Sequence, residues 1–248
     1  MTTLSGSAHY APAATATELG QVVALGSRVL AANGHDDFIW GHLSVRDPDG
    51  RGIWMKRSGL GLEEVVGDDI ILVDFDGNVL QGDGPSHVEW PIHTEVHLAR
   101  NDIGAVVHTH SPNCIAIAAS GQPLKPVSHW ATLFVPPDVP RFTRTANLIV
   151  TRELGRQVAQ GIGEQHALFL VNHGIVVCGT DVPDAVARAV LLEKACHQQL
   201  LTIAAGGIAV HSSDEEALAK RETIWSESAR NGLWEYLVRR LESDRRQA

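Results

Sequence analysis

Apolar residues recur at helical spacing in several parts of the chain, and short strand-like blocks lie between them. The pattern predicts helices at 18–32, 90–100, 114–119, 147–160 and 184–205. It predicts strands at 38–46, 52–56, 69–73, 79–81, 106–109, 167–171 and 175–178. Turn sequences such as Asp47-Pro48-Asp49-Gly50 join neighbouring strands as hairpins. This order of elements predicts the α/β class, with a mainly antiparallel sheet covered by helices.

The two ends of the chain depart from this pattern. Residues 1–15 are small and polar, and we expect them to form a flexible tail. Residues 214–246 are expected to form one charged amphipathic helix that carries Trp225, Trp234 and Tyr236. With 248 residues, 44% of them hydrophobic, the chain suits one large domain at 16–248, with this helix as its C-terminal tail, better than two small ones.

Charge and composition narrow the class of protein. The formal net charge of −9 argues against nucleic acid or an anionic membrane as a partner. No apolar stretch is long enough to span a bilayer, and the N-terminus lacks the basic and apolar regions of a signal peptide. Cys114, Cys178 and Cys196 have apolar neighbours and are predicted to be buried thiols. We therefore expect a cytoplasmic protein that acts on a small molecule.

Three histidines and one glutamate form a candidate metal site. His108 and His110 close an apolar run, and side chains two apart on a strand point to the same face. His173 lies in a predicted turn between two strands, and Glu89 opens a predicted helix. Three protein ligands leave a coordination position open for water or substrate, which is typical of a catalytic site. Imidazole suits zinc best here, and manganese, cobalt or iron also fit.

A second set competes with this one. Glu89, His93 and His97 lie at positions i, i+4 and i+8 on one face of the predicted helix, and histidines four apart can also bind zinc. Glu89 fits either set. Spacing alone leaves both open.

A series of motifs across residues 41–207 resembles the class II aldolase/adducin family. The motifs are Gly41-His42-Leu43-Ser44-Val45-Arg46, Ser58-Gly59, the segment 69–77, Pro85-Ser86, Glu89 with His93, His108-Thr109-His110-Ser111-Pro112, Asn172-His173-Gly174, and the helix 185–205 followed by Gly206-Gly207. The resemblance implies a three-layer α/β/α fold around a mixed, mainly antiparallel sheet. It also implies a homotetramer with active sites at the subunit interfaces.

Carried over by position, the resemblance assigns roles to the residues of the site. It implies that His108, His110 and His173 are the metal ligands, that Glu89 is the catalytic acid/base and that His93 is structural, which decides between the two sets. We expect a raised pKa for the Glu89 carboxyl in an apolar pocket. Positions that match pocket loops, or that stand where the family has aromatic contacts from a neighbouring subunit, are predicted to bind substrate: His42, Ser58, Gly59, Ser86, His87, His129, Trp130 and Tyr236.

Two departures from the family's sugar-phosphate aldolases bear on the substrate. Gly41-His42 stands where those enzymes carry Gly-Asn, and Pro85-Ser86-His87-Val88-Glu89 is one residue longer than their Pro-Ser-Ser-Glu. Both changes would reshape a phosphate pocket, and the Gly-His version resembles decarboxylases of hydroxylated aromatic or pyridine dicarboxylates. We therefore predict a divalent-metal-dependent carbon–carbon lyase, favouring decarboxylation of a 3,4-dihydroxyphthalate-like compound.

Two alternatives remain. The first is a class II aldolase or epimerase acting on a sugar phosphate or another hydroxy-carbonyl compound. The second is an adducin-like module without catalysis, which the complete set of three histidines and Glu89 disfavours.

Overall fold

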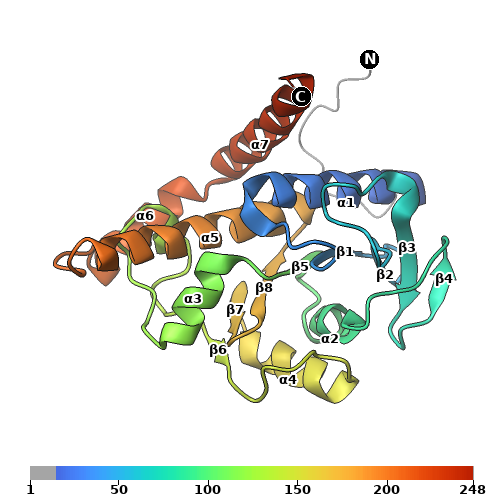
Figure 1. The fold of residues 1–248 in the computed structure, drawn as a ribbon, viewed down its shortest axis with the longest axis horizontal. Coiled ribbons are helices and arrows are strands. Elements are labelled where there is room, and N and C mark those ends of the chain that lie inside the picture. Colours follow the sequence, from blue (N-terminus) through green and yellow to red (C-terminus); the bar gives the residue numbers. More distant parts are fainter. Residues whose placement is uncertain (1–14, 248) are drawn as a thin grey trace.

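The computed structural model describes residues 15–247, which form three α/β/α layers around one eight-stranded sheet (Figure 1). The strand order is β4-β3-β2-β1-β5-β8-β7-β6. The strands are β1 His42–Arg46, β2 Gly52–Lys56, β3 Ile70–Asp74, β4 Val79–Gln81, β5 Ala105–Thr109, β6 Arg141–Phe142, β7 Ala167–Leu170 and β8 Gly174–Gly179. Only β6 and β7 pair in parallel within this sheet, so the predicted mixed, mainly antiparallel sheet is confirmed.

Helices cover both faces of the sheet. They are α1 Ala16–Leu30, α2 Trp90–Ala99, α3 Pro112–Ser120, α4 Arg152–Ile162, α5 Val182–Ala204, α6 Asp214–Ile224 and α7 Glu227–Gln247, with short helical segments at Ala31–His35, Gly67–Asp69 and Trp130–Leu133. One buried apolar cluster joins α1, α3 and α5 to the sheet, and a second joins α2 and α4 to its other face. The far end of α7 extends away from the sheet (Figure 1).

Short polar side chains fix where several helices begin. The Thr15 hydroxyl accepts the Glu18 N–H, and the Glu18 carboxylate accepts the Thr15 N–H in return. Asp181 accepts the Asp184 N–H at the start of α5, with Pro183 in the first turn. These caps place α1 and α5 within two residues of the predicted starts.

Three predicted elements are corrected. The strand expected from residue 38 begins at His42, because Phe38 (φ 51°) and Gly41 (φ 75°) leave the extended conformation. The helix expected from 147 begins at Arg152, because the Thr151 hydroxyl caps it by accepting the Leu154 N–H. The C-terminal region forms two helices, α6 and α7, rather than one.

Three further expectations concern the N-terminal tail, the cysteines and membrane-spanning segments. The tail expected at 1–15 lies outside the described residues except for Thr15. All three cysteines are free and buried, as predicted. Within 15–247, none of the helices combines the length and apolar character needed to cross a membrane.

Candidate metal centre and pocket

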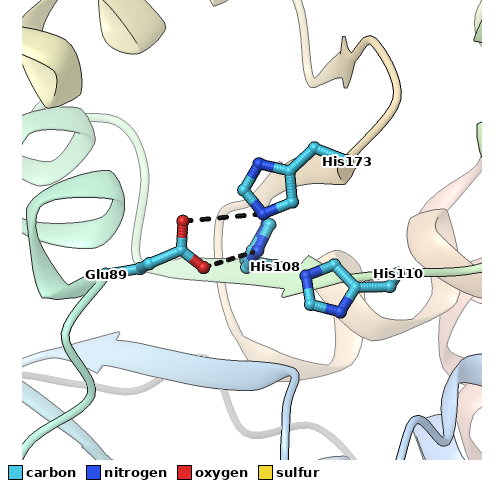
Figure 2. Close-up of side chains that lie close together, drawn as sticks. All are labelled: Glu89, His108, His110 and His173. Carbon is cyan, nitrogen blue, oxygen red and sulfur yellow. Dashed lines mark ion pairs between the residues drawn. The ribbon is translucent and has the colours of Figure 1, made fainter. Parts of the chain in front are cut away.

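Four side chains from distant parts of the chain converge at one end of β5. The candidate ligand atoms of Glu89, His108, His110 and His173 all lie within 4.8 Å of one another. Figure 2 shows the Glu89 carboxylate directed at the rings of His108 and His173, with His110 beside them. Glu89 precedes α2, His108 lies on β5 with His110 just beyond its end, and His173 lies between β7 and β8. The sequence-predicted ligand set is therefore brought together.

The turn between β7 and β8 aims His173. Asn172 adopts a left-handed conformation (φ 59°), which asparagine tolerates better than most residues. The His173 N–H then donates to the Leu170 carbonyl at 3.0 Å. At Gly174, an added Cβ would lie 2.4 Å from the Thr109 carbonyl oxygen and 2.9 Å from the His110 ring. Gly174 thus permits the close approach of this turn to the end of β5.

Hydrogen bonds orient two of the imidazoles. His108 Nδ1 lies 2.9 Å from the Ile175 carbonyl oxygen, which can only accept, so Nδ1 carries the proton and Nε2 keeps its lone pair. His110 Nδ1 lies 2.7 Å from Asp37 Oδ2, which is also an acceptor, so the proton of His110 is likewise on Nδ1. A ring held by an acceptor on one nitrogen presents the other to a metal, as metal-ligating histidines commonly do.

The second ring nitrogens have no hydrogen-bond partner, although the Glu89 carboxylate lies 3.5 Å from two of them. Nε2 of His108, His110 and His173 is shielded from solvent in each case and makes no hydrogen bond. Such orphaned buried groups are rare and call for an explanation. Three converging imidazole lone pairs and one carboxylate fit a divalent cation, and this donor set is typical of zinc.

The Glu89 carboxyl is buried but held in its charged form. Its oxygens lie 3.5 Å from His108 Nε2 and 3.5 Å from His173 Nε2, and Oε1 accepts the Ile149 N–H at 2.7 Å. Burial raises its pKa, but the neighbouring His108 and His173 rings and the Ile149 N–H outweigh burial and hold the pKa well below its ordinary value. The expected raised pKa is therefore wrong for this arrangement.

A cavity of about 390 Å³ opens beside the four residues. Apolar side chains of Trp40, Val88 and Leu148 form part of its wall. The remaining lining residues are Asp37, Gly41, His42, His87, Glu89, His110, Asn172 and His173. A small apolar pocket with a few convergent polar groups is typical of a ligand site.

Comparison with known proteins identifies the family. Residues 21–200 match the family model described as Class II Aldolase and Adducin N-terminal domain. The chain belongs to this family. A 3,4-dihydroxyphthalate decarboxylase from Arthrobacter keyseri is 31% identical over 198 residues, covering 75% of this chain and 79% of the relative. A 5-methylthioribulose-1-phosphate/5-deoxyribulose-1-phosphate aldolase from Rhodospirillum rubrum is 31% identical over 185 residues, covering 74% of this chain and 81% of the relative.

A solved class II aldolase shows how far the likeness extends in three dimensions. The L-fuculose 1-phosphate aldolase from Glaciozyma antarctica superposes with a TM-score of 0.83 at 26% sequence identity, covering 98% of this chain and 96% of that one. Enzymes of the class II aldolase family are lyases that use a divalent metal. The His/Glu cluster of this chain is a candidate for holding such an ion.

The predicted substrate-binding residues divide into two groups. His42 and His87 line the pocket. Ser58, Gly59, Ser86, His129, Trp130 and Tyr236 are not among the residues that line it. Trp130 lies in a short helical segment, and Tyr236 is half exposed on α7. A substrate role for the second group stays a prediction.

The competing histidine set is placed elsewhere. His93 and His97 are buried on α2 and belong to a hydrogen-bonded network with Ser44, outside the four-residue cluster. Among the described residues, Glu89 joins the β5 set and not a helical one. The geometry thus brings together the set that the family resemblance favours, and its role as the ligand set stays a prediction.

Several site residues escaped the sequence-based prediction. Asp37, Trp40 and Leu148 lie in loops; the sequence pattern placed Trp40 in a strand and Leu148 in a helix, which begin only at His42 and Arg152. Ile149 contributes through its backbone N–H, which no residue pattern reveals. Metal-ligating histidines commonly donate to a carboxylate, but nothing in the sequence singled out Asp37.

Proposed function

We propose that this class II aldolase family member is a metal-dependent decarboxylase of a hydroxylated aromatic dicarboxylate, similar to 3,4-dihydroxyphthalate. The observation that carries the proposal is that His42 and His87 both line the pocket beside Glu89, with ring centroids 4.4 Å apart. These residues lie in the two segments where the chain departs from the family's sugar-phosphate aldolases. The relative from Arthrobacter keyseri named as a 3,4-dihydroxyphthalate decarboxylase adds support.

The pocket walls suit a flat ring. Trp40, Val88 and Leu148 present apolar surface, which would pack against the faces of an aromatic compound. The volume of about 390 Å³ is at the lower end of the range for small-molecule sites, as a one-ring substrate requires.

Within the cluster, we assign the three histidines to binding the ion and Glu89 to proton transfer. His108, His110 and His173 would hold the ion, with Asp37 and the Ile175 carbonyl fixing two of the rings. Zinc is the first choice, and manganese, cobalt or iron also suit imidazole ligands. The bound ion supplies a Lewis acid that stabilises negative charge on a substrate oxygen.

Glu89 is proposed to carry the proton that decarboxylation requires. When the bond between the ring carbon and the carboxylate breaks, its electron pair stays on the ring carbon, which must then be protonated. Glu89 is charged at rest, so it would first accept a proton from a substrate hydroxyl and then deliver it to that carbon as carbon dioxide leaves. The Ile149 N–H holds Oε1 in place throughout.

Aldol cleavage is the second candidate function. It also leaves electrons on carbon next to an oxygen, so the same cluster would serve it. The fold likeness to the L-fuculose 1-phosphate aldolase, with a TM-score of 0.83, is the observation that favours it.

A direct assay distinguishes the two reactions. Zinc-loaded protein is mixed with 3,4-dihydroxyphthalate, and carbon dioxide release and substrate absorbance are followed, while a parallel reaction offers an aldehyde and a ketone phosphate. We expect carbon dioxide release, and a His42→Asn variant should lose most of it while His211→Asn, at an exposed residue, should not. Aldol turnover without carbon dioxide release would overturn the proposal.

We further propose that the protein assembles as a homotetramer with interfacial active sites. His129, Trp130 and Tyr236 do not line the pocket of their own chain, so a neighbouring copy would bring them to it. Light scattering of the purified protein tests the assembly, and a monomer with full activity would contradict it.

A further inference from the structure

Within 15–247, no lysine or arginine side chain lines the pocket, although the proposed substrate carries two carboxylates. The acidic side chains of Glu89 and Asp37 do line it and would repel an anionic ligand. One end of the ligand can bind the ion, but a second carboxylate needs N–H donors, because burying an unpaired charge is costly. Uncharged side chains of the wall are therefore the candidate donors.

Asn172 and Trp40 are, among the described lining residues, the ones whose side-chain N–H groups do not depend on a tautomer. An imidazole N–H can lie on either ring nitrogen, whereas a carboxamide and an indole keep theirs at any pH. Within 15–247, neither the Asn172 amide nor the Trp40 Nε1–H has a hydrogen-bond partner. The wall thus contains two unused donors.

Both donors come from turns with an unusual backbone. Among the described residues, Phe38 (φ 51°) and Asn172 (φ 59°) are the only ones other than glycine with a positive φ. The Trp40 N–H closes the turn that contains Phe38 by donating to the Asp37 carbonyl at 3.0 Å. The Phe38 ring packs edge-on against the indole, with centroids 6.0 Å apart. Such costly conformations persist where the surrounding structure requires them, and they cluster at ligand sites.

At residue 172 the backbone alone would favour glycine. Glycine adopts the left-handed region without steric cost, and asparagine only tolerates it. The backbone therefore limits which residue types fit at this turn, but it does not require an amide. The position of Asn172 in the pocket wall supplies a reason, because glycine here would remove the amide from the wall.

Exposure distinguishes the mouth of the pocket from its floor. His42, His87 and Glu89 are buried at 3%, 6% and 5% exposure. Asn172 is exposed, and Trp40 is 51% exposed, so the two unused donors lie at the mouth. A carboxylate that stays charged throughout the reaction costs least there, where water still reaches it. A donor on the departing carboxylate would instead stabilise the starting state more than the transition state, in which the charge moves to the ring.

We propose that Asn172 is a specificity residue that donates its side-chain N–H to the carboxylate that the substrate keeps, with Trp40 Nε1–H as a second donor. The ion and Glu89 then act on the other end of the ring. The aromatic class of this ligand rests on the proposed function, whereas binding of a carboxylate at the mouth is independent of carbon dioxide release.

Two probes that differ by one carboxylate measure this recognition without turnover. Calorimetry compares the affinities of zinc-loaded protein for 3,4-dihydroxybenzoate and for catechol, and we expect wild type to prefer 3,4-dihydroxybenzoate. Asn172→Gly fits the left-handed backbone and removes the amide. It should reduce the preference roughly tenfold, as expected when one hydrogen bond to a charged group is lost, and leave the affinity for catechol unchanged.

Three further variants define the cause. Asn172→Asp keeps the shape of the side chain but places a negative charge against the carboxylate, so the preference should fall further than in Asn172→Gly. Trp40→Phe removes the indole N–H, keeps an apolar ring and should also lower the preference; a wild-type preference would remove the second donor. The matched control is Asn101→Gly, at an exposed asparagine in a turn that does not line the pocket, which should bind both probes as wild type does.

The outcomes separate this inference from the proposed function. An unchanged preference in Asn172→Gly contradicts the carboxylate site. Metal analysis shows whether the ion is retained beside His173, and if Asn172→Gly loses it, an unchanged preference in Asn172→Asp contradicts the site equally. A protein with the expected preferences that releases no carbon dioxide would keep the carboxylate site and lose the decarboxylase assignment. Carbon dioxide release without a preference for 3,4-dihydroxybenzoate would do the reverse.

Discussion

Two groups of histidines lie on the same side of the sheet and differ in one respect. His108 and His173, with His110 beside them, leave Nε2 without a hydrogen-bond partner. His93 uses both ring nitrogens in bonds to His42 and Ser44. Burial does not separate the groups, because His93 and His108 are both fully buried. A metal centre is therefore indicated by nitrogens that the protein leaves unbonded, rather than by the number or burial of histidines.

The surrounding elements explain the difference. His93 and His97 project from α2 onto β1, where the Ser44 hydroxyl lies between them as donor and acceptor. The other group lies where β5 ends and the turn before β8 closes over it, and two side-chain carboxylates face it: Asp37 accepts from His110 Nδ1, and Glu89 is itself a ligand candidate. Fold position thus gives one group a structural network and the other an open coordination set.

The largest effect is expected from His173→Ala. Neither ring nitrogen of His173 has a hydrogen-bond partner, so the substitution removes a ligand and breaks no other hydrogen bond of this side chain. We expect ion affinity to fall by more than about 100-fold, beyond the change that outer residues cause. Metal content of the purified variant after dialysis measures it. A wild-type content would remove His173 from the ligand set.

Glu89→Gln separates ion binding from chemistry. The amide oxygen can still accept the Ile149 N–H, but the side chain no longer accepts and returns a proton. We expect turnover to fall by about 10²–10⁴-fold while the three histidines retain the ion. Steady-state kinetics with 3,4-dihydroxyphthalate and metal analysis of the same sample test this. Full activity would rule out the proton-carrying role.

Asp37→Asn tests whether a hydrogen-bond acceptor at His110 Nδ1 strengthens the binding of the ion by His110 Nε2. The variant removes the charge that faces His110 Nδ1 and keeps the size of the side chain. We expect ion affinity to fall by about 10-fold, at the low end of the range for such partners. The neighbouring exposed Asp36 provides the control, Asp36→Asn, which should bind the ion as wild type does. Equal affinities of the two variants would contradict the orienting role.

The smallest effect on the ion is expected from Ser44→Ala, which belongs to the other histidine group. Loss of the hydroxyl leaves buried nitrogens of His93 and His97 without their partner, so the free energy of unfolding should fall by about 1–3 kcal/mol. Denaturant unfolding measures this, with metal analysis alongside. If the ion were lost instead, the two groups would be one coupled unit and the comparison would fail.

The parts of the site that follow from chain geometry were predictable, and the parts that depend on loops were not. The shared face of His108 and His110 follows from the two-residue repeat of a strand. The inclusion of His173 and Glu89 needed the family match, because the spacing of His93 and His97 was equally suitable. Asp37 and Ile149 enter from loops, and no pattern of residue types reports where a loop backbone lies.

The pKa of Glu89 shows why neighbours in sequence mislead. Trp90 directly follows Glu89 in the sequence, but its ring packs against Gly77 and the cluster of β2 and β3. The groups that actually surround the carboxylate come from positions 108, 149 and 173 and are hydrogen-bonding groups. The sequence thus indicated which residue is buried but not what it is buried against.

The four candidate ligands are separated along the chain, from Glu89 to His173, and come from a helix start, a strand and a turn. In the unfolded chain they are dispersed, so the ion would bind almost only the native state. Each tenfold rise in free ion above its dissociation constant would then add about 1.4 kcal/mol to the free energy of unfolding. The site would act as a reversible cross-link between β5, the turn before β8 and the start of α2, and its tightness would be readable from the melting temperature alone.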